Sequence, residues 1–560
     1  MKKNSFRTSL TLLLSIVFLA GSLVCPGRVS AAGGAQKPAA AVVKHDQKLT
    51  YSLVSLPTID PQKFNASPSY GVIKGYAEGL INAHNGIVSP GVAESWDIAS
   101  DNKTMTFHLR KDAKWSDGTP LTAKDFVYAF RRLADPKNNC DYRWVLSEIV
   151  NGEDIAYGDG TVPASELGVS APDNYTFVIK FHVPAPYYLG FLDMPVFYPV
   201  KQELVEKYGD QYAMSADKVL GNGPFVIKEY SFEQKVVMVP NENYWNRKAI
   251  KLQECDVLMM EQEAAFAAFQ NGEVDFARIP VAVAPGYLAN PSLLPGADVT
   301  TYMSGAVDWY CINIASKTNP ILGNKDFRLA LNYALDRDQY VKISSNGLYK
   351  PATRFVLPAV SGVKGSYCDE YPINVYKTGA EIDKAKQHLN AAMAAMGIKD
   401  PSQISIALKI SDTAESRLIV ENCQDQWQKA LGIKVTIEIV TYRAMLSDRV
   451  AGNFDLIYAG WMPDYNDPYT YLGYFISSNS QNGGKFSNAR YDDLVNSANN
   501  YPDQAKRLSM YAEAEQILLE EAGIVPLQVR QVPDARISSL KNFSRFFLGA
   551  EEDWTLSYFE

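Results

Sequence analysis

The side chains that most often carry enzyme chemistry are few in this sequence, or lack a recognisable arrangement. Its 560 residues include five histidines and six cysteines, against 62 aspartates and glutamates. No HExxH, GxSxG or GxxxxGK[ST] motif is present, and Gly483-Gly484-Lys485 lacks the rest of a phosphate-binding loop. The histidines without metal-site spacing are His45, His84, His108, His182 and His388. We therefore predict no catalytic residues and no metal site, although a site assembled from distant residues stays open.

One acidic stretch has the residue types of a binding site for a cation. Gly460-Trp461 is followed by Met-Pro-Asp464-Tyr-Asn-Asp467-Pro468. A buried carboxylate at Asp464 would bind an ammonium group through a charge-assisted hydrogen bond worth roughly 1.5–3 kcal/mol. The same residues are also good turn formers, so a structural role of Asp464 as a loop cap is equally consistent with the sequence.

Strand and helix patterns interleave along the chain, which predicts an α/β fold. Thr122 to Asp125 has the spacing of a capping box, with Asp where Glu is usual. The predicted strands are 48–54, 104–110, 175–181, 236–239, 404–410 and 434–440. The predicted helices are 72–80, 125–132, 326–345, 381–396, 415–431 and 503–521.

The N-terminus has the features of a secretory signal peptide. Three basic residues precede an apolar run over 10–24, which is too short to span a membrane. Small residues at 29–31 predict cleavage before Ala32. We therefore expect residues 1–31 to be a signal peptide, residues 32–43 to be a linker, and the mature protein to be periplasmic or otherwise extracytoplasmic.

The cysteines leave two questions open. Cys25 follows the apolar run, at the position where a bacterial lipoprotein is cut and acylated, but Ser22 and Val24 make a poor lipobox. Both soluble export and lipid anchoring at Cys25 therefore stay open. An odd number of cysteines remains after cleavage, so at least one thiol is free or pairs between molecules. These five are Cys140, Cys255, Cys311, Cys368 and Cys423.

The mature chain is acidic. Residues 1–31 contain four basic residues and no acidic one, so their removal changes the formal charge from −8 to −12. An acidic surface repels nucleic acid and anionic lipid, so we expect neither as a partner. With 47% hydrophobic and 21% charged residues, the chain is expected to be globular, and its length predicts roughly two to four domains.

Seven longer motifs lie in order along the mature chain. They are PGVAESW at 90–96, TFHLRKDAKWSDG at 106–118, TPLTAKDFVY at 119–128, GNGPF at 221–225, NYW at 243–245, DFRLALNYALDR at 326–337 and GWMPDYNDP at 460–468. Together these motifs resemble the peptide-binding family of bacterial extracellular solute-binding proteins, family 5. The resemblance covers nearly the whole mature chain, and its motifs are specific.

The resemblance implies a two-lobed periplasmic-binding-protein fold of class II, with three domains and hinge closure on the ligand. Lobe I would combine residues 44–77, 201–305 and 531–560. An inserted domain would take residues 78–200, and lobe II would take residues 306–530.

The resemblance also implies that main chain from both lobes pairs with an extended peptide, which makes binding indifferent to the peptide's side chains. Gly460 would permit close approach of the ligand. The segments that would pair are Gly460, Trp461 and Met462 on one lobe, and Asn65, Ala66 and Ser67 on the other.

Individual side chains would add to this backbone pairing. Asp464 matches the family's aspartate that binds the peptide N-terminus. Arg449 matches an arginine near the site. Trp461 would either line a side-chain pocket or fill the core, and Tyr142 would either face the ligand or pack inside the inserted domain.

The sequence departs from the oligopeptide-binding members of the family at three places. Tyr458 replaces an arginine that meets peptide carboxylates, and Asn65 replaces a glutamate. Met462 and Ala306 replace the two cysteines of a family disulfide, so both partners are missing together. These departures leave the preferred peptide length and the recognition of the peptide C-terminus open.

The sequence therefore predicts the substrate-binding subunit of an ABC transporter, a monomer that captures oligopeptides between two lobes and delivers them to permease subunits. We expect no enzyme activity and no cofactor. A binder of dipeptides, nickel chelates, haem or sugars within the same family stays open, as does a secreted hydrolase. The absence of a histidine or cysteine cluster disfavours direct metal binding.

Overall fold

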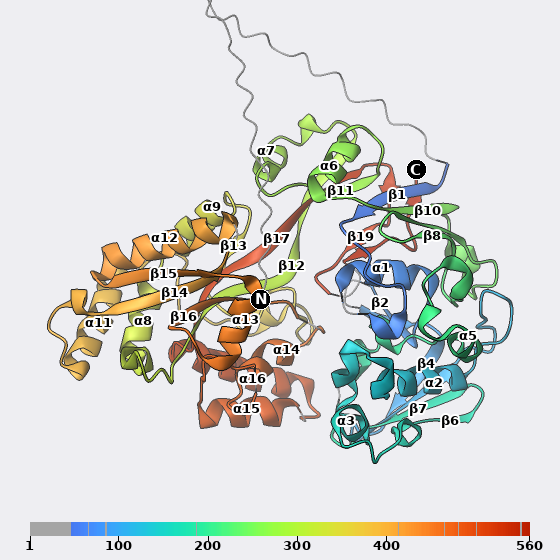
Figure 1. Ribbon diagram of the computed structural model, residues 1–560, viewed down its shortest axis with the longest axis horizontal. Helices are drawn as coiled ribbons and strands as arrows, with labels where there is room; N and C mark the ends of the chain where they lie inside the picture. The colour runs from blue at the N-terminus through green and yellow to red at the C-terminus, as the bar shows by residue number, and fades with distance from the viewer. Residues whose placement is uncertain are drawn as a thin grey trace, which may run out of the picture. The chain divides into compact units, whose positions relative to one another are not determined.

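The computed structural model describes residues 46–560 of the chain except 65, 85–86, 186, 413, 464, 480, 500 and 549–550. Helices and strands alternate along this part (Figure 1), which confirms the predicted α/β class. Among these residues, no helix is both long enough and apolar enough to cross a membrane. The predicted signal peptide, linker and Cys25 lie outside the described residues.

Eleven strands form the largest sheet. Ten of them follow the order β15-β14-β16-β12-β17-β11-β1-β10-β9-β8, and β13 pairs with β17 beside this path. Their bounds are β1 (Lys48–Leu53), β8 (Phe225–Ser231), β9 (Lys235–Pro240), β10 (Glu254–Met259), β11 (Phe276–Arg278), β12 (Ala297–Ile312), β13 (Lys350–Pro351), β14 (Ser405–Ser411), β15 (Lys434–Val440), β16 (Leu456–Trp461) and β17 (Ile524–Ile537).

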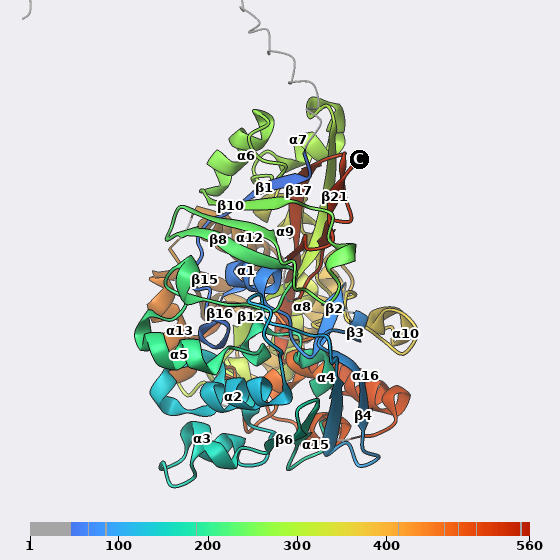
Figure 2. The same ribbon diagram turned by 90° about the vertical axis from the view of Figure 1, so that its right-hand side faces the viewer.

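Two long strands, β12 and β17, run through the middle of this sheet and pair with each other in antiparallel fashion. At one end β16 pairs with β12, and at the other end β11 pairs with β17. Figure 1 shows α6 (Gln262–Gln270) and α7 (Ala284–Ala289) near β11, and Figure 2 shows both helices near the upper ends of β1 and β17. The register of β12 shifts between Met303 and Val307, where Gly305 has a φ of +78°. Such a bulge bends a strand locally.

The strands β14, β15 and β16 form a parallel unit with two helices. Helix α12 (Ala414–Leu431) connects β14 to β15, and α13 (Tyr442–Ala451) connects β15 to β16. β14 pairs in parallel with both strands, one on each side. Leu408 of β14 and Trp427 of α12 are fully buried in the same core. Since the chain changes direction of winding at β14, a crevice is expected beyond the carboxyl ends of these strands.

A separate antiparallel sheet lies within the predicted inserted domain. Its order is β4-β5-β7-β6, with β4 (Ala93–Ile98), β5 (Thr104–Leu109), β6 (Val169–Asp173) and β7 (Thr176–Lys180). Helix α2 (Ala123–Ala134) packs on it, and its Phe130 ring lies 5.2 Å from that of Phe177. The predicted capping box is present, because the Thr122 amide donates to Asp125 Oδ2 at 2.7 Å. The domain boundaries themselves stay a prediction.

Two predicted helices were wrong in their limits. The predicted helix 326–345 is two helices, α8 (Lys325–Ala334) and α9 (Arg337–Ser344). The Asp336 carboxylate caps α9 by accepting from the Gln339 amide at 2.8 Å, and this competes with a continuous helix. The predicted helix 72–80 is α1 (Ser67–Tyr76), which starts earlier because a proline occupies its first turn and ends where Ala77 is extended.

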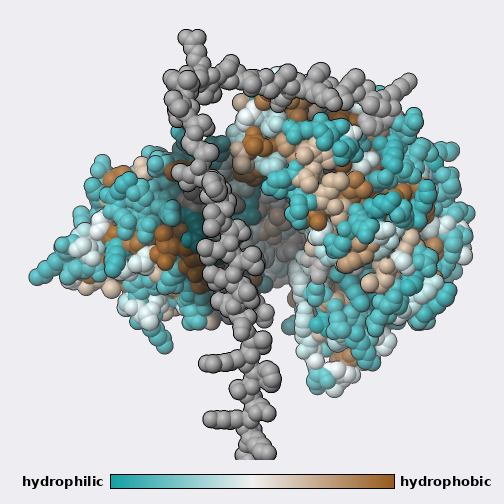
Figure 3. Space-filling view, turned by 45° about the horizontal axis from the view of Figure 1, so that its top comes forward, coloured by the Kyte–Doolittle hydropathy of each residue, from teal (hydrophilic) through white to brown (hydrophobic). Residues whose placement is uncertain are grey.

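The other predicted helices and strands are present within a few residues of their expected limits, including α11 (Ile382–Met396) and α16 (Gln504–Glu520). All five described cysteines are free and buried, which confirms that at least one thiol is free. Burial raises their thiol pKa, for Cys311 to about 12. Figure 3 shows hydrophilic residues over most of the visible face, as expected for an acidic globular chain.

Candidate functional site

A cavity of about 420 Å³ opens at the carboxyl ends of β14 and β16. Its walls come from β14, α12, α13, β16 and β17, which matches the crevice expected from the winding of the strands. We call it the arginine cavity, because Arg449 and Arg530 are the charged members of its lining. Its lining residues are Ala306, Ser411, Ile419, Tyr442, Met445, Leu446, Arg449, Tyr458, Ala459, Gly460, Trp461, Met462 and Arg530.

Strand β16 has a backbone edge beside this cavity without a partner strand in the described part of the chain. β12 pairs with β16 from Leu456 to Trp461. On the other edge, β14 pairs only with Leu456 and Ile457. From Ala459 to Trp461, this second edge can therefore accept an added strand through its main-chain groups, whatever the side chains of that strand.

Gly460 lies directly beside a buried ion pair. Arg530 donates to both carboxylate oxygens of Asp308 at 2.9 Å, and Gln528 Nε2 donates at 3.0 Å. A Cβ atom on residue 460 would lie 2.8 Å from Asp308 Oδ1, so only glycine permits this approach. Burial alone would lower the pKa of Arg530, but the neighbouring Asp308 carboxylate raises this pKa by more than burial lowers it. The net shift is therefore upward, and the guanidinium stays protonated.

Arg449 supplies a second cation to the same cavity. It lies in the last turn of α13, and its guanidinium makes no hydrogen bond or ion pair with the residues that the structure describes. A guanidinium presents five N–H donors in a planar fork that matches a carboxylate. The arginine cavity is therefore suited to hold an anionic group.

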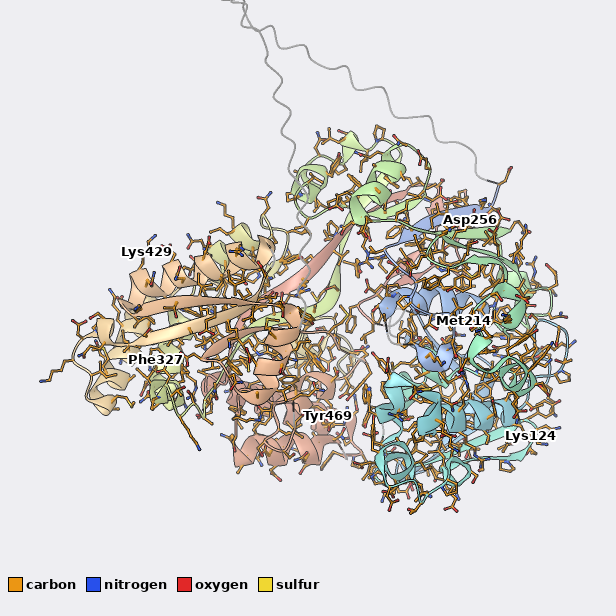
Figure 4. All side chains as sticks on the ribbon, viewed as in Figure 1. Lys124, Met214, Asp256, Phe327, Lys429 and Tyr469 are labelled. Carbon is orange, nitrogen blue, oxygen red and sulfur yellow. The ribbon has the colours of Figure 1, made fainter. Side chains whose placement is uncertain are left out.

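Trp461 also lines a second cavity, of about 460 Å³. We call it the aromatic cavity, because six of its lining residues are aromatic and none is charged. Tyr469, labelled in Figure 4, comes from α14 (Tyr469–Leu472), whereas Tyr142 and Trp144 come from the predicted inserted domain. The six aromatic residues are Tyr142, Trp144, Trp461, Tyr465, Tyr469 and Tyr474.

The loop after Trp461 carries Asp464, which lies outside the described residues. The rest of the loop is held by residues of the predicted lobe II. Asp467 accepts two hydrogen bonds from Arg507, at 2.5 and 2.8 Å, and both side chains are more than nine-tenths buried. Asn466 Oδ1 accepts from the Ser361 amide at 2.9 Å. These contacts fix the position of the loop that leads from the arginine cavity to the aromatic cavity.

The comparison with protein families identifies this architecture. The family model of bacterial extracellular solute-binding proteins, family 5 middle, matches residues 88–483. The chain belongs to this family. It is 31% identical over 513 residues to the periplasmic oligopeptide-binding protein of Salmonella typhimurium, which covers 91% of this chain and 92% of that protein. It is 30% identical over 442 residues to the dipeptide-binding protein of Bacillus subtilis, covering 78% of each.

The family's fold is also matched by a solved structure. A periplasmic murein tripeptide binding protein in its unliganded open form is similar with a TM-score of 0.79 and 29% identity, over 92% of this chain and 98% of that one. This confirms the predicted class II periplasmic-binding-protein fold. Family 5 proteins bind solutes and are not enzymes, which confirms that prediction as well.

The structure places most of the residues that the family resemblance predicts for the binding site around the two cavities. Tyr142 shares the aromatic cavity with Trp461. Asp464 and Asn65 lie outside the described residues. No group of histidines, cysteines and carboxylates within the described part of the chain is arranged to hold a metal ion. The predicted residues on the arginine cavity are Arg449, Tyr458, Gly460, Trp461 and Met462.

Ala66 and Ser67 line neither cavity. Ala66 is the N-cap of α1, and Ser67 is the first residue of this helix. The ring of Phe64 nevertheless lies 5.6 Å from that of Tyr142, which lines the aromatic cavity. The predicted contact of this segment with a ligand stays a prediction.

The ion pair of Asp308 and Arg530 was missed from the sequence. Arg530 is the single charged residue within the otherwise apolar or amide stretch 524–532, and Asp308 lies between Val307 and Trp309. A charge inside a strand with buried neighbours is a usable signal, because such charges need a partner. The partner itself cannot be read from the sequence, since 222 residues separate the two.

Proposed function

We propose that this protein captures oligopeptides outside the cytoplasm and delivers them to the permease subunits of an ABC transporter. The observation that carries the proposal is the edge of β16 from Ala459 to Trp461, which pairs with no other strand among the described residues and lies beside a cavity lined by Arg449. An extended peptide adds to such an edge as a further strand. The similarity to an oligopeptide-binding protein over nine-tenths of the chain supports this ligand class.

The charged ends of the peptide would be bound by side chains. Asp464 binds the α-ammonium group, and Arg449 binds a carboxylate in the arginine cavity. Each charge-assisted hydrogen bond of this kind is worth roughly 1.5–3 kcal/mol. Because Tyr458 stands in place of the family's arginine, Arg449 is the cation on this wall that has no partner among the described residues.

Closure of the two lobes would bring the facing main chain onto the ligand. In this proposal Asn65, Ala66 and Ser67 belong to lobe I, and residues 306–530 form lobe II. The strands β12 and β17 connect the two lobes, so the bulge near Gly305 is the expected hinge position. A ligand shifts this equilibrium only by its preference for the closed form.

A signal peptide over 1–31 would export the chain, which would act as a monomer with its peptide ligand and the importer as partners. Relatives described as periplasmic support this location.

Dipeptides are a second candidate ligand class. The relative from Bacillus subtilis is named a dipeptide-binding protein and is 30% identical over 78% of this chain. A dipeptide would place its carboxylate only two residues from the ammonium bound by Asp464. Peptide length is therefore a variable in the test.

The test is a thermal-shift series on the purified protein with pools of di-, tri-, tetra- and pentapeptides. Each pool is used with a free and with an acetylated N-terminus. Ligand at about 100 times its Kd adds roughly 2.7 kcal/mol to the free energy of unfolding. We expect stabilisation by the free-amine pools. No shift with any pool, once co-purified ligand has been stripped, would contradict peptide binding.

The role of Asp464 is tested on the same samples. Asp464→Ala is expected to weaken free-amine peptides about ten-fold or more and acetylated peptides much less, because only the former lose an ion pair. The matched control is Asp97→Ala, at an aspartate whose side chain is 80% exposed and lines neither cavity. Equal losses for both kinds of peptide would remove Asp464 from this role.

A further inference from the structure

Arg449 contributes to the arginine cavity a charge that no described residue neutralises. The other cation of the lining, Arg530, is paired with Asp308, whereas Arg449 makes no hydrogen bond or ion pair in the described part of the chain. Arg449 lies in the last turn of α13, where the partial negative charge of the helix end favours a cation. Because no acidic side chain holds the guanidinium, its position depends on how the backbone and the aliphatic stem of Arg449 are packed.

The acidic residue that precedes Arg449 in the sequence is paired with another cation. Lys409 of β14 is 8% exposed, and its Nζ lies 2.8 Å from Asp448 Oδ2 and 3.3 Å from Glu438 Oε2. The same Nζ donates to Asn453 O at 2.5 Å. Asp448 is therefore bound by Lys409 and not by Arg449, and these contacts connect the last turn of α13 to β14.

Hydrogen bonds from Asn313 fix the main chain that follows Arg449. Gly452 ends α13 in the left-handed conformation, with a φ of +74°. Asn313, the residue after β12, donates from Nδ2 to Gly452 O at 3.0 Å and to Phe454 O at 3.1 Å. The end of α13 is therefore held from both β14 and β12.

The loop 479–486 packs directly against Arg449 at Gly483. A Cβ atom on residue 483 would lie 2.4 Å from Arg449 O and 3.0 Å from Arg449 Cγ. Gly483 is not among the glycines with a positive φ, so close approach and not backbone conformation is the reason for glycine here. The contact therefore restrains both the main chain and the stem of Arg449.

This loop is itself held in place. Asn482 is 2% exposed, donates from Nδ2 to Phe486 O at 2.8 Å and accepts from the Phe486 amide at 3.2 Å. Gly484 O accepts from the Ile314 amide at 3.0 Å. A Cβ atom on residue 484 would lie 2.7 Å from Ile312 O, at the end of β12. The two consecutive glycines therefore contact different neighbours, Gly483 the end of α13 and Gly484 the end of β12.

We infer that Gly483 is a positioning residue, which holds the Arg449 guanidinium in the arginine cavity where it binds the carboxylate of the ligand. The inference rests on the proposed function, which gives Arg449 this role. A cation held by packing has no protein partner to lose when the ligand binds, so less of the binding free energy is spent on rearrangement. The Gly-Gly pair, which lacks the rest of a phosphate-binding loop, thus acts through Arg449 and does not itself contact the ligand.

The experiment is a calorimetric titration of the full protein with di- to pentaalanine, each as the free acid and as the C-terminal amide. Gly483→Ala places a methyl group against Arg449, which has to move. We expect the free acids to bind about three-fold or more weakly and the amides to change by less than about two-fold. Equal losses for acids and amides, or no loss for either, would overturn the inference.

Gly484→Ala is the matched control, because its added methyl group meets β12 and not Arg449. It should lower the stability of the protein but leave the ratio of acid to amide affinity unchanged. Gly379→Ala, at a glycine with no atom within 4 Å of the added Cβ, should change neither. A change of the ratio in Gly484→Ala as large as that in Gly483→Ala would contradict a specific role of Gly483.

Asn482→Ala keeps the test decisive if Gly483→Ala does not fold. It removes the hydrogen bonds between Asn482 and Phe486 and adds no atom beside Arg449. The loosened loop should lower the ratio of acid to amide affinity in the same direction, by about two-fold or more. An unchanged ratio in this variant would overturn the inference.

A double variant tests whether Gly483 acts through Arg449. In an Arg449→Ala background, Gly483→Ala should change neither affinity further, because the guanidinium that it displaces is absent. A further loss for the free acids, or an Arg449→Ala variant that weakens acids and amides equally, overturns the inference and leaves peptide capture standing. If no probe binds the unmodified protein, the proposed function fails and the inference fails with it.

Discussion

The two cavities share Trp461, and each lies beside an ion pair of arginine and aspartate, but the pairs differ in depth. At the arginine cavity Asp308 is fully buried, whereas 43% of the Arg530 side chain is exposed. Beside the aromatic cavity, Arg507 and Asp467 are 2% and 7% exposed. An arginine–aspartate pair therefore contributes an exposed charged group to the wall of the arginine cavity, whereas the pair beside the aromatic cavity only holds the loop in place. Depth of burial, together with the residues that line each cavity, therefore decides its character.

Under the proposed function, main-chain pairing along β16 and the cations of the arginine cavity would recognise groups that all peptides have. The aromatic cavity has no charged residue in its lining, so it would not bind the charged ends of a peptide. Variants that affect one cavity and leave the other unchanged test this difference.

The largest effect is expected from removal of the deeper ion pair. Asp467→Ala leaves Arg507 buried and without its bidentate partner, which is expected to lower the free energy of unfolding by about 3–5 kcal/mol. Urea denaturation measures this loss. The matched control is Asp97→Ala, whose contact with the His108 ring is exposed, so that its loss is expected to change stability by less than about 1 kcal/mol. Similar losses in both variants would contradict the argument from depth.

A smaller effect, on binding alone, is expected at the arginine cavity. Arg449→Ala removes a cation that has no protein partner in the described part, so the fold should be retained. Peptides with a free C-terminal carboxylate should bind about ten-fold less tightly, and C-terminally amidated peptides should change little. Isothermal titration calorimetry measures both affinities.

Arg417→Ala is the matched control for this variant, because Arg417 lies on α12 with its side chain 53% exposed and is paired with Asp412. It should leave both affinities unchanged. A loss in Arg449→Ala that is the same for carboxylate and amide peptides would show that Arg449 does not bind the peptide carboxylate.

The smallest effect concerns the half-buried Glu148 behind the aromatic cavity. Burial raises the pKa of Glu148 above its ordinary 4.5, by more than the hydrogen bond from Tyr187 lowers it. At a pH between the unfolded and the folded pKa, Glu148 therefore keeps a proton in the folded protein that it has lost in the unfolded chain. This contribution to stability is complete below the unfolded pKa and is lost as the pH rises through the folded pKa.

Glu148→Gln keeps an acceptor for Tyr187 and removes this titration. We expect it to raise stability near pH 7 by up to about 1 kcal/mol and to flatten the pH dependence above about pH 4.5. Urea unfolding between about pH 4 and pH 7 measures it, with Glu153→Gln at an exposed residue as the control. A steeper pH dependence in Glu148→Gln would contradict the assigned direction.

Much of the fold could be predicted because its signals are local. The alternation in β5 and β14 and the capping box at Thr122 and Asp125 are properties of a few consecutive residues. The break between α8 and α9 at Asp336 was missed. The apolar periodicity continues through it, whereas the Asp336 carboxylate caps α9 and so separates the two helices.

The residues of the candidate site also fall into those that a local motif predicts and those that it does not. Gly460, Trp461 and Met462 are consecutive, and Arg449 belongs to the helix that precedes their strand, so a motif was sufficient to name them. Trp144, Tyr469 and Arg530 come from three distant segments and were not named. Nothing in their immediate sequence indicates that they line the two cavities around Trp461.

The α/β class and the family could be predicted from the amino-acid sequence, because they follow from local patterns and from motifs in a fixed order. The difference between the two cavities could be seen only in the folded protein. That difference depends on how deeply Arg530 and Arg507 are buried and on which rings meet across the fold. Burial depth is a property of packing between distant segments, so no local pattern contains it.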